Sequence, residues 1–80
     1  MTEEQKKLIE EICTNVGIHS LKGGLSHKEV FNIVISLATG MAIGMKLKYE
    51  DEADDFSKIM LKVMLDIYAE EVVSWLEKMH

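Results

Sequence analysis

The 80-residue sequence contains no arginine and no proline, and it has a single cysteine. Arginine is the side chain that most readily grips phosphates and reads guanine edges through paired hydrogen bonds. Its absence, together with a net charge of −5, argues against direct binding of DNA or RNA. The same acidic balance argues against attachment to an anionic membrane surface. We therefore expect any macromolecular partner to be a protein.

The lone cysteine, Cys13, cannot form a disulfide within the chain and lies on the apolar face of a predicted helix. It is typical of a small buried hydrophobic residue in a reducing compartment. After Met1 the chain continues with TEEQKK and shows no apolar segment of a secretory signal. The expected location is the cytoplasm.

The hydrophobic runs are too short to cross a membrane. The longest uncharged stretch covers residues 30–45, VFNIVISLATGMAIGM, and lysines follow or precede it closely on both sides. A membrane span needs about 20 predominantly apolar residues, so we expect no span. The stretch is instead the centre around which a helical protein must assemble.

The first of three segments with helical apolar periodicity covers about residues 3–16. Its start, TEEQ, has the form of a capping box with Thr2 as the N-cap. We expect Gly17 to end this helix, because glycine is the commonest residue just beyond a helix C-terminus.

The other two helical segments are longer. One covers residues 27–48 and begins with a second capping box, SHKE, at Ser26. The last begins near Asp51 or Asp54, either of which could be its N-cap, and continues to about Lys78. The expected fold is all-α, with a short N-terminal helix and two long antiparallel helices.

This single helical domain, residues 1–80, has more apolar surface than three helices can cover, since 48% of its residues are hydrophobic. A domain of this size buries only about 60% of the surface of its unfolded chain. We therefore expect a helical-bundle homo-oligomer, most simply a two-fold dimer. The expected interface combines small residues of the second helix with apolar residues of the third: Ser36, Gly40, Gly44, Tyr68, Val72 and Trp75.

Two observations support this interface, and each has an alternative. Small residues at i, i+4 and i+8 share one helix face and allow a second backbone to approach closely, but Gly40 and Gly44 could instead only bend the helix. The third helix carries a wide apolar arc, whose alternative is one core stripe with scattered exposed residues. One side of the arc consists of Leu61, Leu65, Tyr68, Val72, Trp75, Leu76 and Met79.

The loop before the second helix has the composition of an anion site. Its glycine pair frees backbone N–H groups, and the positive end of a helix follows at once. An anionic small molecule or nucleotide could bind there, at an oligomer interface; the alternative is a plain turn with a capping serine. The candidate residues are His19, Lys22, Gly23, Gly24, Ser26, His27 and Lys28.

An acidic run follows the second helix, and its candidate contacts to a protein partner are Glu50, Asp51, Glu52, Asp54 and Asp55. Such a surface could mimic a phosphate backbone and occupy a basic groove. The E-x-x-D spacing of Glu52 and Asp55 resembles part of the Mg²⁺ site of all-α nucleotide pyrophosphohydrolases of the MazG type. The upstream E-x-x-E of that family is missing here. The alternative is a run of solvated, helix-capping carboxylates.

These patterns leave three functions open. The first is a small acidic, non-enzymatic protein that forms homo-oligomers and binds, or inhibits, a protein partner. The second is a binder of an anionic ligand or nucleotide, and the third is an Mg²⁺-dependent nucleotide hydrolase. We favour the first. We expect no catalytic residues, no metal site and no cofactor, because neither a catalytic triad nor a zinc-ligand spacing is present.

Overall fold

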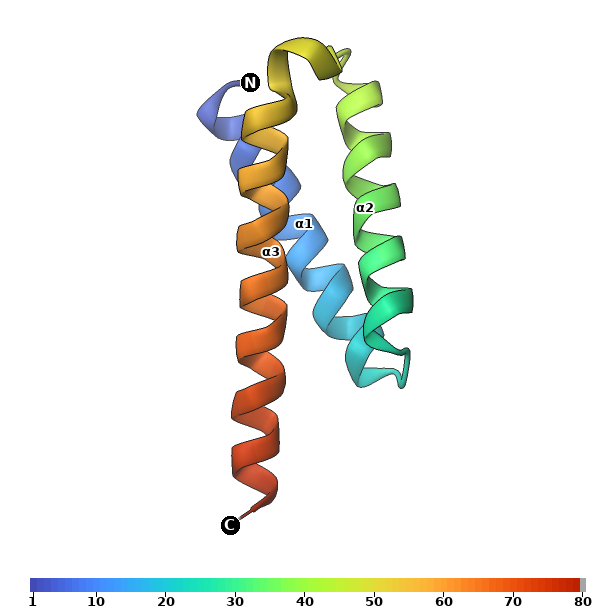
Figure 1. Cartoon of the computed structure of the whole chain (residues 1–80), viewed down its shortest axis with the longest axis vertical. Coiled ribbons are helices and arrows are strands. Elements are labelled where there is room, and N and C mark those ends of the chain that lie inside the picture. The colour runs from blue at the N-terminus through green and yellow to red at the C-terminus, as the bar shows by residue number, and fades with distance from the viewer. Residues whose placement is uncertain (80) are drawn as a thin grey trace.

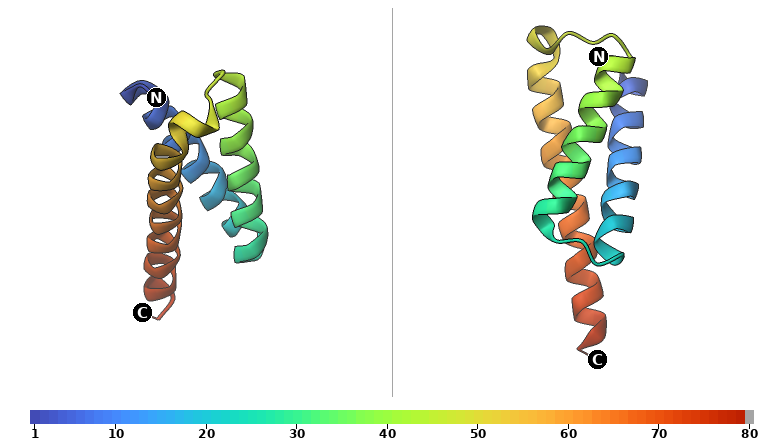
Figure 2. Two further views of the ribbon diagram at one scale, coloured as in Figure 1. Left: turned by 45° about the horizontal axis from the view of Figure 1, so that its top comes forward. Right: turned by 90° about the vertical axis from the view of Figure 1, so that its right-hand side faces the viewer.

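The computed structural model describes residues 1–79 and contains three helices (Figure 1). They are α1 (Glu3–Lys22), α2 (His27–Gly44) and α3 (Tyr49–Lys78). The all-α prediction is confirmed, and residues 1–79 form no strand. The connection between α2 and α3 lies at one end of the molecule, and the connection between α1 and α2 lies toward the other end, where α3 continues beyond it (Figure 1, Figure 2). None of these helices is both long and apolar enough to cross a membrane.

The first helix, α1, is the centre of the fold. It packs against both α2 and α3, whereas α2 and α3 approach each other much less closely. In Figure 1, α1 runs obliquely across the space between the other two helices. The prediction of a short first helix is wrong, since α1 has 20 residues and α2 has 18.

The buried core consists of one face of each helix. On α1 and α2 its residues are spaced by four, which places them in a single row. Cys13 is fully buried, as predicted, and burial raises the pKa of its thiol. The buried residues are Ile9, Cys13 and Gly17 of α1, Val30, Val34 and Ala38 of α2, and Ile59, Met60, Val63 and Ile67 of α3.

The prediction that Gly17 ends α1 is wrong, because this glycine lies inside the helix where α1 meets both neighbours. A Cβ atom at position 17 would overlap Cδ1 of Ile67 and would lie 3.0 Å from Cγ1 of the same residue. It would also lie 3.2 Å from Cγ2 of Val34. Glycine costs about 1 kcal/mol of helix propensity, and close packing on two sides offsets that cost.

The glycine pair after Lys22 ends α1 instead. Gly24 has a φ of +98°, which glycine adopts without the steric cost of a side chain. The N–H of Gly24 donates to the carbonyl of Leu21 at 3.1 Å, and the N–H of Leu25 donates to the carbonyl of Ser20 at 3.2 Å. These two hydrogen bonds form a Schellman motif, with Leu25 as its customary apolar residue.

The second helix also ends in a Schellman motif, but Lys46 occupies the left-handed position with a φ of +61°. The N–H of Lys46 donates to Ile43 at 2.9 Å, and the N–H of Leu47 donates to Ala42 at 3.0 Å. A side chain in this conformation costs about 1–2 kcal/mol. The second helix ends at Gly44, earlier than the expected residue 48. The left-handed position after it, which is usually a glycine, is Lys46.

Both predicted capping boxes are confirmed. The hydroxyl of Thr2 accepts from the N–H of Gln5 at 3.1 Å, and Oε1 of Gln5 accepts from the N–H of Thr2 at 2.9 Å. The hydroxyl of Ser26 accepts from the N–H of Glu29 at 3.2 Å, and Oε1 of Glu29 accepts from the N–H of Ser26 at 3.1 Å. These reciprocal bonds fix the starts of α1 and α2.

The third helix starts earlier than expected. Its N-cap is Lys48, whose side chain makes no capping hydrogen bond, so the assignment of Asp51 or Asp54 as N-cap is wrong. Glu50, Asp51 and Glu52 instead lie within the first turn. Negative side chains there favour the helix through its dipole without capping it directly.

The small residues of α2 lie on an exposed edge, which comprises Ser36, Gly40 and Gly44. A Cβ atom added at Gly40 or Gly44 would meet no atom within 4 Å among the residues described. Within the chain, it is Gly17, and not Gly40 or Gly44, that allows neighbouring helices to pack closely. The role of this edge in contact between copies stays a prediction.

Replacing Gly17 by alanine is expected to lower the free energy of unfolding by up to about 2 kcal/mol. Overpacking of a core costs about 1–3 kcal/mol, and the gain in helix propensity offsets about 1 kcal/mol of it. Urea unfolding followed by circular dichroism measures the change. Gly40→Ala is the matched control and should raise the free energy of unfolding by up to about 1 kcal/mol, because its Cβ meets open space. Equal effects of the two substitutions would contradict the packing role of Gly17.

Candidate functional site

A stripe of exposed apolar side chains runs along α3. Leu61 and Met79 are each 63% exposed, Leu65 and Trp75 60%, Tyr68 59% and Val72 40%. We call these six residues the α3 seam. They include the three α3 residues predicted to lie at an oligomer interface, Tyr68, Val72 and Trp75.

The seam residues are spaced alternately by four and three positions, which is the heptad spacing of a coiled-coil contact. At 3.6 residues per turn they share one face of the helix. The buried residues Val63 and Ile67 occupy the opposite face, which packs against α1. α3 therefore has two apolar faces, and only one of them is covered within the chain.

The last turns of α3 extend beyond the loop that joins α1 and α2 (Figure 1). The last residue of α1, Lys22, lies beside Glu70, with its Nζ 3.6 Å from the carboxylate. Val73 and Leu76, which follow Glu70 on α3, are 50% and 46% exposed. This extension widens the apolar surface at the C-terminal end of the seam.

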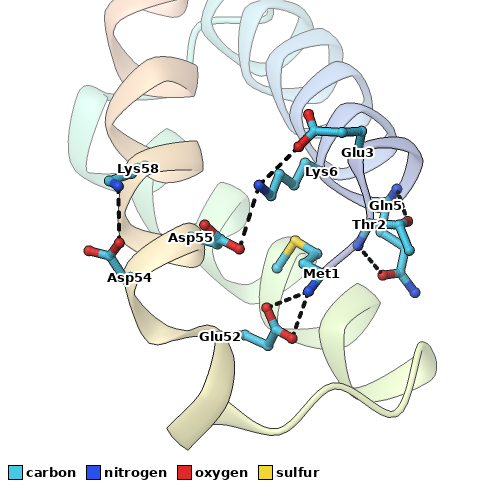
Figure 3. A network of polar contacts seen from close by, with 9 residues as sticks. All are labelled: Met1, Thr2, Glu3, Gln5, Lys6, Glu52, Asp54, Asp55 and Lys58. Carbon is cyan, nitrogen blue, oxygen red and sulfur yellow. Dashed lines mark hydrogen bonds and ion pairs between the residues drawn. The ribbon is translucent and has the colours of Figure 1, made fainter.

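The acidic run at the start of α3 contributes two carboxylates to the fold itself (Figure 3). Both carboxylate oxygens of Glu52 accept from the amino group of Met1 at 2.8 Å. The carboxylate of Asp55 lies 3.6 Å from Nζ of Lys6, which also contacts Glu3 at 3.2 Å. Glu3 and then Asp55 raise the pKa of Lys6. Glu52 and Asp55 therefore hold the start of α1 against α3.

The other predicted partner contacts, Glu50, Asp51 and Asp54, are exposed. Asp54 makes only a local ion pair with Lys58, at 3.0 Å, one turn further along α3. Exposed pairs of this kind contribute about 0.5 kcal/mol or less. These three carboxylates are therefore accessible to a partner, in contrast to Glu52 and Asp55.

Both carboxylates of the E-x-x-D pair are engaged in ion pairs within the chain. Glu52 and Asp55 each have a cationic neighbour, the Met1 amino group and Lys6. Within residues 1–79, no group of three or more His, Cys, Asp and Glu side chains could hold a metal ion. The ion pairs account for these two carboxylates.

The loop predicted to bind an anion borders a cavity of about 410 Å³ between the α1–α2 connection and α3. Its lining combines Lys22, Gly24 and His27 with the carboxylates of Glu70 and Glu71. Nε2 of His27 lies 2.8 Å from Oε1 of Glu71, and Lys22 pairs with Glu70. Lys22 and His27 thus both face carboxylates, and these carboxylates oppose a bound anion.

The remaining residues predicted for the anion site are not gathered around this cavity as ligands. Gly23 is the C-cap of α1, and the Ser26 hydroxyl is engaged as the N-cap of α2. His19 and Lys28 have exposed positions on α1 and α2. Anion binding at this loop therefore stays a prediction with little geometric support.

A second cavity, of about 270 Å³, lies where the end of α2 meets the start of α3. Apolar side chains dominate its lining, and two of them, Ile43 and Tyr49, are 71% and 79% exposed. No sequence pattern predicted this cavity. Its residues come from both sides of the connection, so no single helical pattern marks them.

Helical periodicity places Leu61, Leu65 and Met79 on one side of the apolar arc of α3, but they were not predicted to lie at the interface. The signal that could have found them is the regular alternation of four and three, which joins them to Tyr68, Val72 and Trp75. A wide apolar arc hides this alternation, because Leu76 and the core residues interrupt the pattern.

The capping carboxylate of Glu29 makes the stability of the chain depend on pH. Hydrogen bonds from the backbone N–H and the hydroxyl of Ser26 lower the pKa of Glu29. A carboxylate with a lowered folded-state pKa stabilises the fold above its unfolded-state pKa, and this effect is lost as the pH falls through the folded-state pKa. Wild type should therefore be more stable than Glu29→Gln at about pH 7. The difference should shrink below pH 4.5.

Urea unfolding at several pH values measures this difference. Glutamine keeps an acceptor for the N–H of Ser26 but cannot ionise, so the comparison isolates the charge. Glu11→Gln, an exposed position on α1, is the control. A stability difference between wild type and Glu29→Gln that stays constant from neutral to acidic pH would contradict the prediction.

Comparisons with models of protein families, with curated proteins and with solved structures found no match to this chain.

Proposed function

We propose that this chain is a small, non-enzymatic interaction protein that forms homo-oligomers through its long helices and binds a protein partner through the acidic start of α3. The observation that carries the proposal is the α3 seam, in which six apolar side chains are 40–63% exposed on the face opposite the core. Large contiguous apolar patches on a protein surface mark interaction sites.

The seam offers apolar area whose burial favours association. A fully buried aromatic side chain covers about 150–250 Å². Tyr68 and Trp75 are 59% and 60% exposed, so together they offer roughly 180–300 Å² of surface to a second copy. Four aliphatic side chains add to this area. Burial of apolar surface is favourable by about 25 cal/mol per Å². A second copy presents an identical seam, so one surface supplies both sides of a two-fold contact.

The exposed edge of α2 is the second proposed contact between copies. Gly40 and Gly44 leave room beside the helix, which allows a second backbone to approach. In the proposed assembly, long helices of the copies pack antiparallel into a helical bundle.

The accessible carboxylates Glu50, Asp51 and Asp54 form the proposed partner surface. Clustered exposed charge of one sign accelerates association with a partner of opposite charge and selects against others. A basic groove on a protein is the complementary surface, and its occupation would inhibit a partner that uses the groove for another ligand. The anion-binding and hydrolase functions have weaker support, because their key charges are paired within the chain.

Mass in solution tests the homo-oligomer. At micromolar concentration, light scattering should give at least twice the chain mass of 9.1 kDa. Leu65→Lys combined with Val72→Lys should give a monomer with an intact fold. Both positions are exposed in the single chain, but the interface would have to desolvate two ammonium groups.

Leu8→Lys is the matched control, because Leu8 is 46% exposed on α1 and lies outside both the seam and the edge of α2. It should keep the wild-type mass. A wild-type monomer, or a seam variant that assembles like wild type, would refute assembly through α3.

Partner capture tests the acidic surface. A protein retained by the wild-type chain should be lost when Glu50, Asp51 and Asp54 are all replaced by lysine. The control replaces Glu11, Asp66 and Glu77 by lysine, which changes the net charge equally at three other exposed positions. Circular dichroism verifies that both variants are folded. Equal loss in the two variants would assign the binding to net charge and reject a specific site.

A further inference from the structure

The pattern along α3 also defines how two copies meet. We propose that the second copy binds the seam antiparallel, in a register that places Leu61 opposite Met79, Leu65 opposite Trp75 and Tyr68 opposite Val72. This inference rests on the homo-oligomer proposed above and adds the direction and register of the contact.

Charges at the start of α3 disfavour a parallel pair. Continuing the heptad back by seven residues leads from Leu61 to Asp54 and from Leu65 to Lys58. These two side chains are 82% and 74% exposed. In a parallel pair, Asp54 would face Asp54 of the other chain and Lys58 would face Lys58, which places like charges together within the contact. In the antiparallel register both lie past the end of the other copy's α3 at Lys78, so neither charge enters the contact.

Side-chain sizes point the same way. A parallel pair would stack Tyr68 on Tyr68 and Trp75 on Trp75, with the smaller Val72 facing itself between them. Its layers would be alternately overfilled and underfilled, and both conditions are destabilising. The antiparallel register places each aromatic residue opposite an aliphatic one, so large and small side chains alternate across the contact.

The antiparallel register also separates the acidic surfaces. In a parallel pair, Glu50, Asp51 and Asp54 of the two copies would lie side by side. In the antiparallel register they lie about 50–60 Å apart at 1.5 Å per residue, far beyond the screening length of about 8 Å at physiological salt. Near the centre of the contact, Glu71 of one copy approaches Glu71 of the other. In each chain, however, His27 already lies 2.8 Å from the carboxylate of Glu71.

The separation has a functional consequence. A dimer of this kind presents one acidic surface at each end, so it can bridge two basic sites on one partner or join two partner molecules. Binding of both ends to one partner raises the effective affinity only if the sites match this span.

Disulfide trapping tests the register. Two variants are made, Leu61→Cys and Met79→Cys, and one carries a tag that makes it separable by size. Cysteines bond when their Cα atoms lie about 4.4–6.8 Å apart, so mild oxidation of a mixture should yield the mixed disulfide at least about ten-fold above either self-linked product. The wild-type chain is the control, because its one cysteine, Cys13, is fully buried.

Ala69→Cys is a second variant, because it leaves all six seam residues unchanged. Position 69 lies at the margin of the seam. The antiparallel register brings the two residues at position 69, one from each chain, side by side. A parallel pair places them on opposite sides of the helix contact. It should self-link on oxidation. This result decides the register even if the substitutions at Leu61 or Met79 weaken the dimer.

The possible results separate the two proposals. Mixed disulfides together with self-linked Ala69→Cys support the antiparallel register. Self-linked Leu61→Cys or Met79→Cys, or a dimer that gives no disulfide at any of the three positions, overturns the register and leaves the homo-oligomer standing. A wild-type monomer by light scattering overturns both.

Discussion

The close contact of α1 with both neighbours is the constraint on which the rest of the structure depends. Side-chain size falls along its buried row, from Ile9 to Cys13 to Gly17, and at Gly17 the side chains of Val34 and Ile67 approach from two sides. Since α2 and α3 approach each other little, α1 joins them. Ion pairs flank this contact, including Lys62 with Glu10 at 2.8 Å, and that carboxylate raises the pKa of Lys62.

This arrangement also explains why a functional surface remains on α3. A helix with two close neighbours can cover a wide apolar arc, but α3 has one close neighbour within the chain. Its inner face, with Val63 and Ile67, is buried against α1, and its outer face, with Leu65 and Trp75, remains exposed. The feature that holds the single chain together therefore leaves a second apolar face available for assembly.

Local signals in the sequence predicted the three helices and the starts of the first two, but not the ends of α1 and α2 or the start of α3. The capping boxes, the burial of Cys13 and the three helices follow from hydrogen-bonding groups and periodicity within a few residues. The sequence could not show that Gly17 serves a helix contact, because a glycine that ends a helix and one that admits a neighbour look alike. Lys46 carries no stop signal at all. The paired state of Glu52 depends on a group 51 positions away, which no local pattern reveals.

The two apolar faces of α3 pose a choice during folding. α1 and α2 are joined by a short loop and can pair early, whereas α3 must close a longer loop to reach α1. Hydrophobic attraction alone does not tell α1 which face of α3 to accept. The cross-helix charges contribute to the choice, since docking by the outer face would turn Asp55, Lys62 and Glu70 away from Lys6, Glu10 and Lys22. Weak surface ion pairs thus add to the close packing of Gly17 against Ile67 in favouring the observed rotation of α3.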